Sequence, residues 1–218
     1  DVIAHVEPTD LVAGVLPCEL RDLGSGLEQA ARLGERMRNE SIGEIWVSDH
    51  TRAHQTAQAV ERTTGAPLSI IDDLGERSLG ALRGTPYSEL DFDPFAPGYT
   101  PPEGESWEAF HARVDRVWAL IESRWFEAFA GRADAGHFAV VTHGLVLRSL
   151  FERRLLGEAG LATHANADGQ VAIANTAVSY IEPIGSAPDD LEFRVDLLAC
   201  IAHLDEETAP RANPNVGM

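Results

Sequence analysis

The sequence predicts an α/β fold, a three-layer α/β/α sandwich in which helices cover both faces of a mostly parallel central sheet. Short apolar runs alternate along the chain with longer segments whose apolar residues recur at helical spacing. This alternation is typical of strands joined by right-handed helical crossovers. Two of the apolar runs, 2–7 and 138–144, carry a histidine at the end of the strand, His5 and His143. Such sheets place their sites at the carboxyl ends of strands, so His5 and His143 predict one shared site.

The composition fits one globular domain with an acidic surface. Of the 218 residues, we assign 1–204 to a single domain and 205–218 to an acidic, mobile C-terminal tail. Seventeen basic and 35 acidic residues give a net charge of −18, which disfavours nucleic acids and anionic membranes as partners. No apolar run is long enough to cross a bilayer, and Cys18 and Cys200 are too few for a disulfide framework, so we expect a cytoplasmic protein.

Strands are assigned to short β-branched runs, and helices to segments with an apolar stripe of 3.6-residue period. In chain order the predicted elements are strand 2–7, helix 26–39, strand 44–47, helix 51–63, strand 67–71, helix 107–130, strand 138–143, helix 145–156, strands 170–174 and 177–182, and edge strand 193–199. Turn formers and acidic residues predict a loop at 8–22, and small residues predict another at 157–169.

Each assignment has a local reason. Helix 26–39 carries its apolar residues largely on one side and its charged residues on the other, and helix 107–130 shows the same separation behind a capping Ser106. The strands 44–47 and 67–71 are short, mostly apolar and bounded by turn residues. These segments are therefore expected to build the core.

The start of helix 51–63 carries a candidate anion site. Either Ser48 or Asp49 can cap its first turn, which leaves backbone amides facing the carboxyl edge of the sheet. Arg52 lies in that turn, where its charge opposes the helix dipole, so an anion between the two would explain its position. A surface ion pair of Arg52 with Asp49 or Asp72 explains it equally well.

Two irregular stretches follow the third predicted strand. Three glycines within 72–84 indicate a loop with unusual backbone angles, which holds Glu76 and Arg77 near the same edge of the sheet. The stretch 85–102 mixes proline with aromatic residues and is long for a connection. We predict that it forms a lid or wall over the site.

Together, the candidate residues are the parts needed to transfer a phosphoryl group without a metal. A neutral imidazole such as His5 can attack phosphorus, cationic Arg52 can bind the equatorial oxygens, and the carboxylic acid of Glu76 can protonate the leaving oxygen. The alternative for each residue is structural: the histidines would bond to neighbouring carbonyls, and Glu76 would pair with Arg77 or Arg52.

The order of several motifs resembles the histidine phosphatase superfamily, the phosphoglycerate mutase-like proteins. Residues 48–57 are similar to the family segment S-x-L-x-R-A-x-Q-T-A, with His50 in place of the leucine, and 74–84 to the loop L-x-E-R-x-x-G-x-L-x-G. Three later segments match in the expected order: Gly104-Glu105-Ser106, Val141-Thr142-His143-Gly144 and Asn175-Thr176-Ala177-Val178. The resemblance covers most of the chain and implies a phosphoglycerate mutase-like fold.

The resemblance also implies roles for individual residues. His5 would be the nucleophile that becomes phosphorylated, Glu76 the proton donor and acceptor, and His143 a third catalytic residue. The phosphate or substrate would be bound by a set of polar residues: Arg52, Arg77, Ser48, Asn175 and Thr176. The substrate would be a small phosphorylated metabolite, with neither a cofactor nor a metal required, and a homodimer would be unsurprising.

One departure from the family weakens this expectation. The family triplet Arg-His-Gly reads Ala4-His5-Val6 here, so the arginine that grips phosphate and the glycine that lets the backbone approach are both missing. Loss of such a charge-assisted contact typically costs on the order of a hundredfold in rate. Arg21, Arg77 and Arg83 are candidates to replace the missing guanidinium.

Three functions are therefore open. The first is a metal-free phosphatase, a phosphoric monoester hydrolase acting through a phosphohistidine at His5. The second is an enzyme on the same scaffold in which His5, His143 and Glu76 perform acid–base chemistry on a substrate without phosphate. The third is a non-catalytic, ligand-binding member. The remaining histidines, including His50 and His54, are interpreted as surface or loop residues, and no third ligand completes a metal site with these two.

Overall fold

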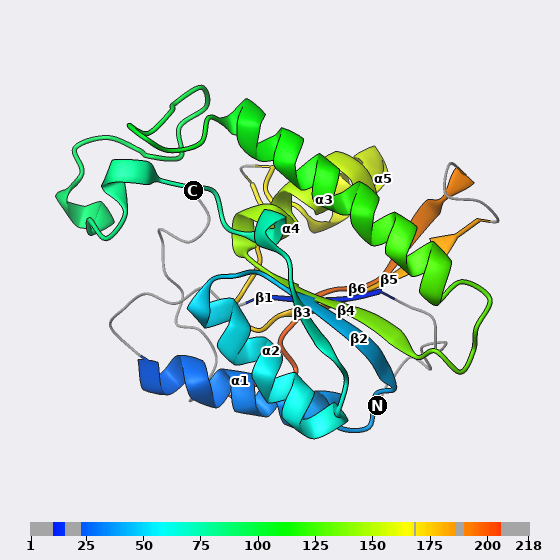
Figure 1. Cartoon of the computed structure of the whole chain (residues 1–218). Helices are drawn as coiled ribbons and strands as arrows, with labels where there is room; N and C mark the ends of the chain where they lie inside the picture. The colour runs from blue at the N-terminus through cyan, green and yellow to red at the C-terminus, as the bar shows by residue number, and fades with distance from the viewer. Residues whose placement is uncertain (1–10, 16–22, 168, 186–189, 206–218) are drawn as a thin grey trace.

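The computed structural model describes residues 11–15, 23–167, 169–185 and 190–205, and within them one six-stranded sheet has the order β3-β2-β4-β1-β5-β6 (Figure 1). The strands are β1 (Leu11–Val15), β2 (Ile42–Val47), β3 (Leu68–Ile70), β4 (His137–Thr142), β5 (Val178–Ile184) and β6 (Glu192–Cys200). Strands β1 to β4 pair in parallel, whereas β5 is antiparallel to β1 and β6 to β5. The predicted mostly parallel sheet is confirmed.

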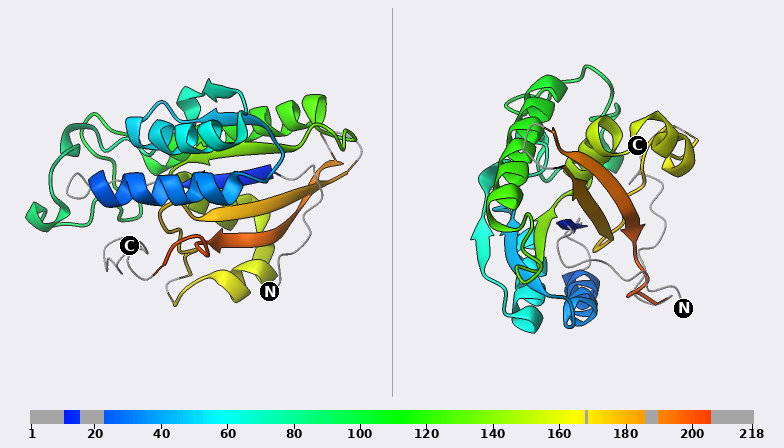
Figure 2. Two further views of the ribbon diagram at one scale, coloured as in Figure 1. Left: turned by 90° about the horizontal axis from the view of Figure 1, so that it is seen from below. Right: turned by 90° about the vertical axis from the view of Figure 1, so that its right-hand side faces the viewer.

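Helices cover both faces of this sheet, as Figure 2 shows in its end-on view. On one face lie α1 (Leu23–Met37) and α2 (Thr51–Thr64), and on the other lie α3 (Trp107–Ala128), α4 (Gly144–Leu150) and α5 (Gly157–His164). A π-helical turn, Phe151–Leu155, follows α4. None of the helices in the described ranges is long and apolar enough to cross a membrane.

Strand β4 contributes side chains to the core on both faces of the sheet. All six of its residues are buried, and successive side chains point to opposite faces. Phe138 and Val140 belong to the core under α3 and α4, whereas Ala139 and Val141 belong to the core under α1 and α2. The unbroken apolar run of this strand thus reflects burial on both sides.

The first described strand differs from the prediction. Residues 11–15 form β1, inside the stretch 8–22 that was predicted as a loop, so that loop prediction is wrong over these five residues. Their apolar run takes the central place between β4 and β5, with Val15 opposite Thr142 and Gly14 opposite Val178. The predicted strand 2–7, with Ala4, His5 and Val6, lies outside the described residues and stays a prediction.

Two later assignments are also corrected. The predicted strand 170–174 forms only an isolated bridge between Ala165 and Val171. Residues 157–164, predicted as part of a loop, form the helix α5. The sequence did not indicate this helix because it contains Gly157 and Gly160, and glycine is a poor helix former. The tail 206–218 lies outside the described residues, and the single domain 1–204 likewise stays a prediction.

Candidate active site

The topology brings the ends of several strands to one edge of the sheet. Ser48 follows β2 and His143 follows β4, and these strands are parallel neighbours with Val47 opposite Val141. Strand β5 runs the other way, so its amino end, preceded by Asn175 and Thr176, reaches the same edge. Four residues predicted from three separate motifs therefore share this edge.

A direct hydrogen bond joins two of them. His143 and Ser48 are both buried, and the Nε2 atom of His143 lies 2.8 Å from the Ser48 hydroxyl. That hydroxyl also accepts the backbone N–H of His50 at 3.2 Å. When the hydroxyl donates to Nε2, the imidazole proton resides on Nδ1 of His143, a buried nitrogen with no hydrogen-bond partner among the described residues. His143 is then a donor available to a ligand.

Burial keeps His143 neutral. Desolvation is the largest cause that lowers its pKa, to about 2, and the positive charge of Arg52, the imidazole of His50 and the charge of Arg113 act in the same direction. A neutral imidazole at this position donates a hydrogen bond without carrying a charge.

This lowered pKa predicts a loss of stability in acid. The unfolded chain protonates His143 below about pH 6.5, whereas the folded chain does not, so the free energy of unfolding falls as the pH drops below that value, by up to about 1.4 kcal/mol per pH unit. Urea unfolding between pH 7 and pH 5 should show a shallower decline for His143→Gln than for the wild type.

His203 provides a comparison, because burial and the charge of Arg36 lower its pKa only to about 4. His203→Gln should remove a decline that is confined to the range between about pH 6.5 and pH 4. A His143→Gln profile parallel to that of the wild type would contradict the prediction for His143.

Glu76 lies on the loop after the 3-10 helix Asp72–Leu74, and its carboxylate is bound from two sides. The oxygen Oε1 accepts the backbone N–H of Arg77 at 3.0 Å, and Oε2 accepts that of Leu145 at 3.3 Å. Leu145 lies in the first turn of α4, two residues after His143. The Glu76 carboxylate therefore lies at the start of the helix that His143 precedes.

The environment of Glu76 favours its protonated form. Burial raises the pKa of the carboxyl, and the two backbone N–H groups and the charges of Arg52 and Arg113 offset this only in part. A carboxyl group with a raised pKa is suited to act as a general acid.

Arg52 lies in the first turn of α2, as predicted. Its positive charge adds to burial in lowering the pKa values of His50 and His143, and it opposes the rise that burial causes in the pKa of Glu76. A single guanidinium that acts on all three groups provides the cation that an anionic ligand at this edge would need.

Arg113, which the sequence reasoning did not identify, holds the Glu76 loop in place. From α3, it donates to the carbonyl oxygens of Asp73 at 2.8 Å and Gly75 at 2.7 Å, and more weakly to that of Glu76 at 3.3 Å. It also forms a two-pronged ion pair with the carboxylate of Glu105, at 2.8 and 2.7 Å. No sequence signal indicated this role, because it depends on how α3 meets the loop.

The contacts of Arg77 are structural, and its predicted role in phosphate binding stays a prediction. Its side chain is buried, and its terminal nitrogens donate to the carbonyl oxygens of Pro94 at 3.2 Å, Tyr99 at 2.7 Å and Glu105 at 3.0 Å. The guanidinium also lies 4.0 Å from the centre of the Trp107 ring. These contacts of Arg77 fix the loop 85–105 in place.

Asn175 and Thr176 reach the predicted edge, but their hydrogen bonds run elsewhere. The Asn175 amide donates to Gln29 at 3.3 Å, and the Thr176 hydroxyl lies 3.0 Å from Nε2 of His203. Thr176 has a φ angle of 54°, which is rare for a β-branched residue. Through these two hydrogen bonds the turn before β5 contacts α1, at Gln29, and the segment after β6, at His203.

His50 precedes α2 on the loop that follows β2, in agreement with the interpretation as a loop residue, but its ring is turned toward the candidate site. Its ring makes an edge-to-face contact with His143, with 4.7 Å between the ring centres. No group of three or more metal-ligating side chains is present in the described part of the chain, so the pair of His50 and His54 is not extended to a metal site.

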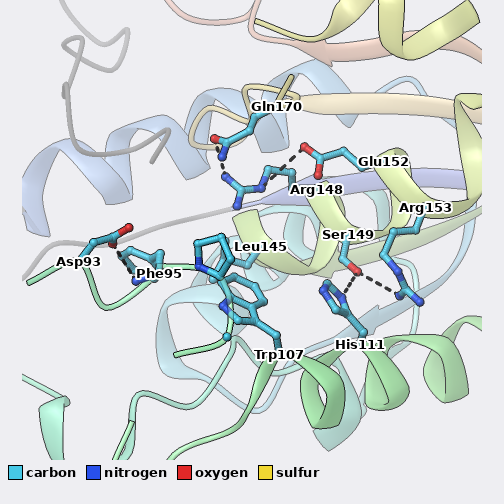
Figure 3. Close-up of a pocket in the computed structure, with 12 residues that line it drawn as sticks. Asp93, Phe95, Trp107, His111, Leu145, Arg148, Ser149, Glu152, Arg153 and Gln170 are labelled. Carbon is cyan, nitrogen blue, oxygen red and sulfur yellow. Dashed lines mark hydrogen bonds and ion pairs between the residues drawn. The ribbon is translucent and has the colours of Figure 1, made fainter. Parts of the chain in front are cut away.

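A cavity of about 580 Å³ lies between the stretch 93–98, Trp107 and α4 (Figure 3). None of Ser48, Arg52, Glu76 and His143 lines it, so a lid or wall over the site stays a prediction. Leu145 links the two places, because it lines the cavity while its N–H binds Glu76. The cavity mixes apolar surface with polar groups such as Arg148, which is bound to Gln170 at 3.0 Å.

Comparisons with known proteins agree with this arrangement. The family model of the histidine phosphatase superfamily (branch 1) matches residues 18–189. Phosphoglycerate mutase-like protein 4 of Arabidopsis thaliana is 32% identical over 154 residues, covering 65% of this chain and 63% of that protein. A probable phosphatase of Schizosaccharomyces pombe is 29% identical, covering 62% of this chain and 47% of its own length. The chain thus spans less than two thirds of either relative.

Solved structures show the same fold. A mycobacterial glucosyl-3-phosphoglycerate phosphatase superposes with a TM-score of 0.65 at 21% identity, covering 88% of this chain and 98% of that one. The alpha-ribazole phosphatase of Shigella flexneri gives a TM-score of 0.67 at 20% identity, with 88% and 97% covered. At 20–21% identity these similarities show the fold alone.

Proposed function

Because the chain belongs to the histidine phosphatase superfamily, we propose that it is a metal-free phosphatase acting on a small phosphorylated metabolite through a phosphohistidine at His5. The observation that supports this most is Glu76, whose buried carboxyl is bound to the start of α4 beside neutral His143, with the charge of Arg52 acting on both groups. Relatives named as phosphatases support the reaction class.

The reaction would proceed in two steps. A nitrogen of His5 attacks phosphorus, the bond from phosphorus to the ester oxygen breaks, and the Glu76 carboxyl gives its proton to the departing alkoxide. The Glu76 carboxylate then takes a proton from water as that water attacks the phosphohistidine, which breaks the phosphorus–nitrogen bond and releases inorganic phosphate. Arg52 and His143 would bind the equatorial oxygens in both steps.

The alcohol part of the substrate would occupy the cavity beside Leu145. Its volume of about 580 Å³ suits a small metabolite, and its walls offer both the ring of Trp107 and hydrogen-bonding groups such as Arg148 and Gln170. This mixture favours a leaving group with an apolar face and several hydroxyl or amide groups.

The test is a panel of phosphomonoesters offered to the protein in the presence of a chelator. We expect turnover, acid-labile phosphate on His5, and loss of both in His5→Ala, because the phosphorylated nitrogen is removed. If the wild type is slow because the triplet arginine is absent, Ala4→Arg should raise the rate on the order of a hundredfold.

One observation favours a second candidate, acid–base chemistry by His143 and Glu76 without a phosphoenzyme. Strand β1, which pairs with β4 at the centre of the sheet, ends at Val15, ten residues beyond His5 in the chain. The carboxyl end of this central strand therefore does not carry the proposed nucleophile. Turnover that survives His5→Ala but is lost in Glu76→Gln would favour this candidate over the phosphohistidine route.

A further inference from the structure

His50 and His143 form a pair of imidazoles tied to one hydroxyl. His50 stands immediately before α2 with an extended backbone, and its N–H donates to the Ser48 hydroxyl that also binds His143. The two rings meet edge to face, 4.7 Å apart at their centres with an angle of 64° between them. His50 is therefore held against the candidate site by both its backbone and its ring.

Each ring has a buried nitrogen whose hydrogen-bonding capacity is unused. Within the described residues, Nδ1 of His50 and Nδ1 of His143 have no hydrogen-bond partner, and His143 is only 1% exposed. Buried polar nitrogens are normally paired, because losing water without gaining a partner costs free energy. Two such nitrogens on touching rings indicate a bound group that pairs with them.

The other edge of the His50 ring faces the loop that carries the proposed proton donor. A Cβ atom placed on Gly75 would lie 4.0 Å from Nε2 of His50 and 3.6 Å from an oxygen of Asp49. Gly75 directly precedes Glu76. His50 thus lies between His143 and the loop that carries Glu76.

The charges around His50 favour an anion as that group. Burial and the positive charges of Arg52, Arg83 and Arg113 lower its pKa, and the nearby carboxylate of Asp49 acts in the opposite direction. The charge of Arg113 is matched by its ion pair with Glu105, so the positive charges of Arg52 and Arg83, against the carboxylate of Asp49, favour an anion here in a chain whose net charge is −18.

We propose that His50 is a phosphate-binding residue of this site, with its imidazole N–H donating to a phosphoryl oxygen beside His143 and Arg52. This inference rests on the proposed function, because it concerns the phosphoryl group of the same site. The family segment has leucine at this position, which has no donor to offer. His50 would therefore replace part of the phosphate contact that the family makes with the triplet arginine and that Ala4 cannot make.

The test measures binding of inorganic phosphate to the full chain, so it does not depend on turnover. We expect His50→Leu to weaken phosphate binding roughly tenfold in calorimetry, the typical effect of losing one hydrogen bond to a charged group. His54→Leu is the matched control one turn further along α2, and it should bind as the wild type does. His50→Gln, which keeps a donor, should recover part of the lost affinity.

A second readout guards against variants that fail to fold. In the wild type labelled with ¹⁵N, added phosphate should shift the imidazole nitrogen signals of His50 and leave those of His54 in place. Equal phosphate affinities for the wild type and a folded His50→Leu variant, or unshifted His50 signals at saturation, would overturn the inference and leave the proposed function intact.

The proposed function can also fail while the role of His50 holds. Turnover that survives His5→Ala would contradict the phosphohistidine route, while a tenfold loss of phosphate binding in His50→Leu would still support His50 as a ligand. A wild type that does not bind phosphate would overturn the role of His50, and the proposed function would then be decided by turnover and by phosphate on His5.

Discussion

Replacing Glu76 by glutamine is expected to lower kcat toward an alkyl phosphate by roughly a hundredfold to ten-thousandfold, the usual contribution of a general acid. An alkoxide is a poor leaving group without a proton, and an amide has none to give. Esters of acidic phenols need less protonation, so the same variant should lose much less activity toward an aryl phosphate. The measurement is kcat for both esters in the wild type and in Glu76→Gln.

The pH profile gives this prediction a direction. Burial raises the pKa of Glu76, so the acid form persists further into the neutral range than for an ordinary glutamate, and kcat should fall as the pH rises through that raised pKa. The Glu76→Gln variant should lack this descending limb. Glu89→Gln, an exposed change on the loop, is the control and should keep the wild-type profile. Equal losses for alkyl and aryl esters would argue against proton donation by Glu76.

Replacing Arg77 by methionine is expected to lower the free energy of unfolding by about 3 kcal/mol, among the largest effects of a single change in this chain. The methionine would leave the carbonyl oxygens of Pro94, Tyr99 and Glu105 without their donor and would remove the cation from the face of Trp107. Urea unfolding at neutral pH measures the loss.

The control for Arg77 is Arg62→Met, an exposed arginine at the end of α2, which should change stability by no more than about 0.5 kcal/mol. The outcome also decides between the two roles considered for Arg77. An Arg77→Met variant with wild-type stability but weakened phosphate binding would support the role predicted from the sequence and contradict the structural one.

The alternation of strands and helices was sufficient to predict most of the fold, because burial on both faces gives β4 an unbroken apolar run and amphipathic packing gives α3 its stripe. Strand β1 was missed for a physical reason. Leu11–Val15 is flanked by turn formers and acidic residues, and what makes it a strand is its pairing with β4 and β5, which no local pattern reveals.

The candidate site was predicted unevenly. Ser48 and His143 follow neighbouring parallel strands, so the strand-end rule was enough to bring them together. The position of Glu76 followed from the motif, but its bond to Leu145 depends on where α4 starts. The structural contacts of Arg77 were not foreseen, because a sequence shows the charge of an arginine and not the carbonyl groups that the fold places around it.

The contact of His50 with the candidate site was likewise not predictable from the sequence. As the residue before a helix it was interpreted as a surface or loop residue, since nothing local indicates which way its ring turns. Its contact with His143 exists because β2 and β4 are adjacent, a relation between residues far apart in the chain. Spacing rules for metal ligands tested His50 only against His54 and therefore overlooked it.

Glu105 has a consequence for how new specificities could arise on this scaffold. Its carboxylate binds Arg113, which holds the Glu76 loop, and its carbonyl oxygen binds Arg77, which holds the wall of the cavity. The wall proposed to select a leaving group and the loop proposed to deliver a proton are thus both bound to Glu105. Insertions in the wall at 93–98 would be transmitted to the acid, so substrate range and catalytic rate would not evolve independently in this protein.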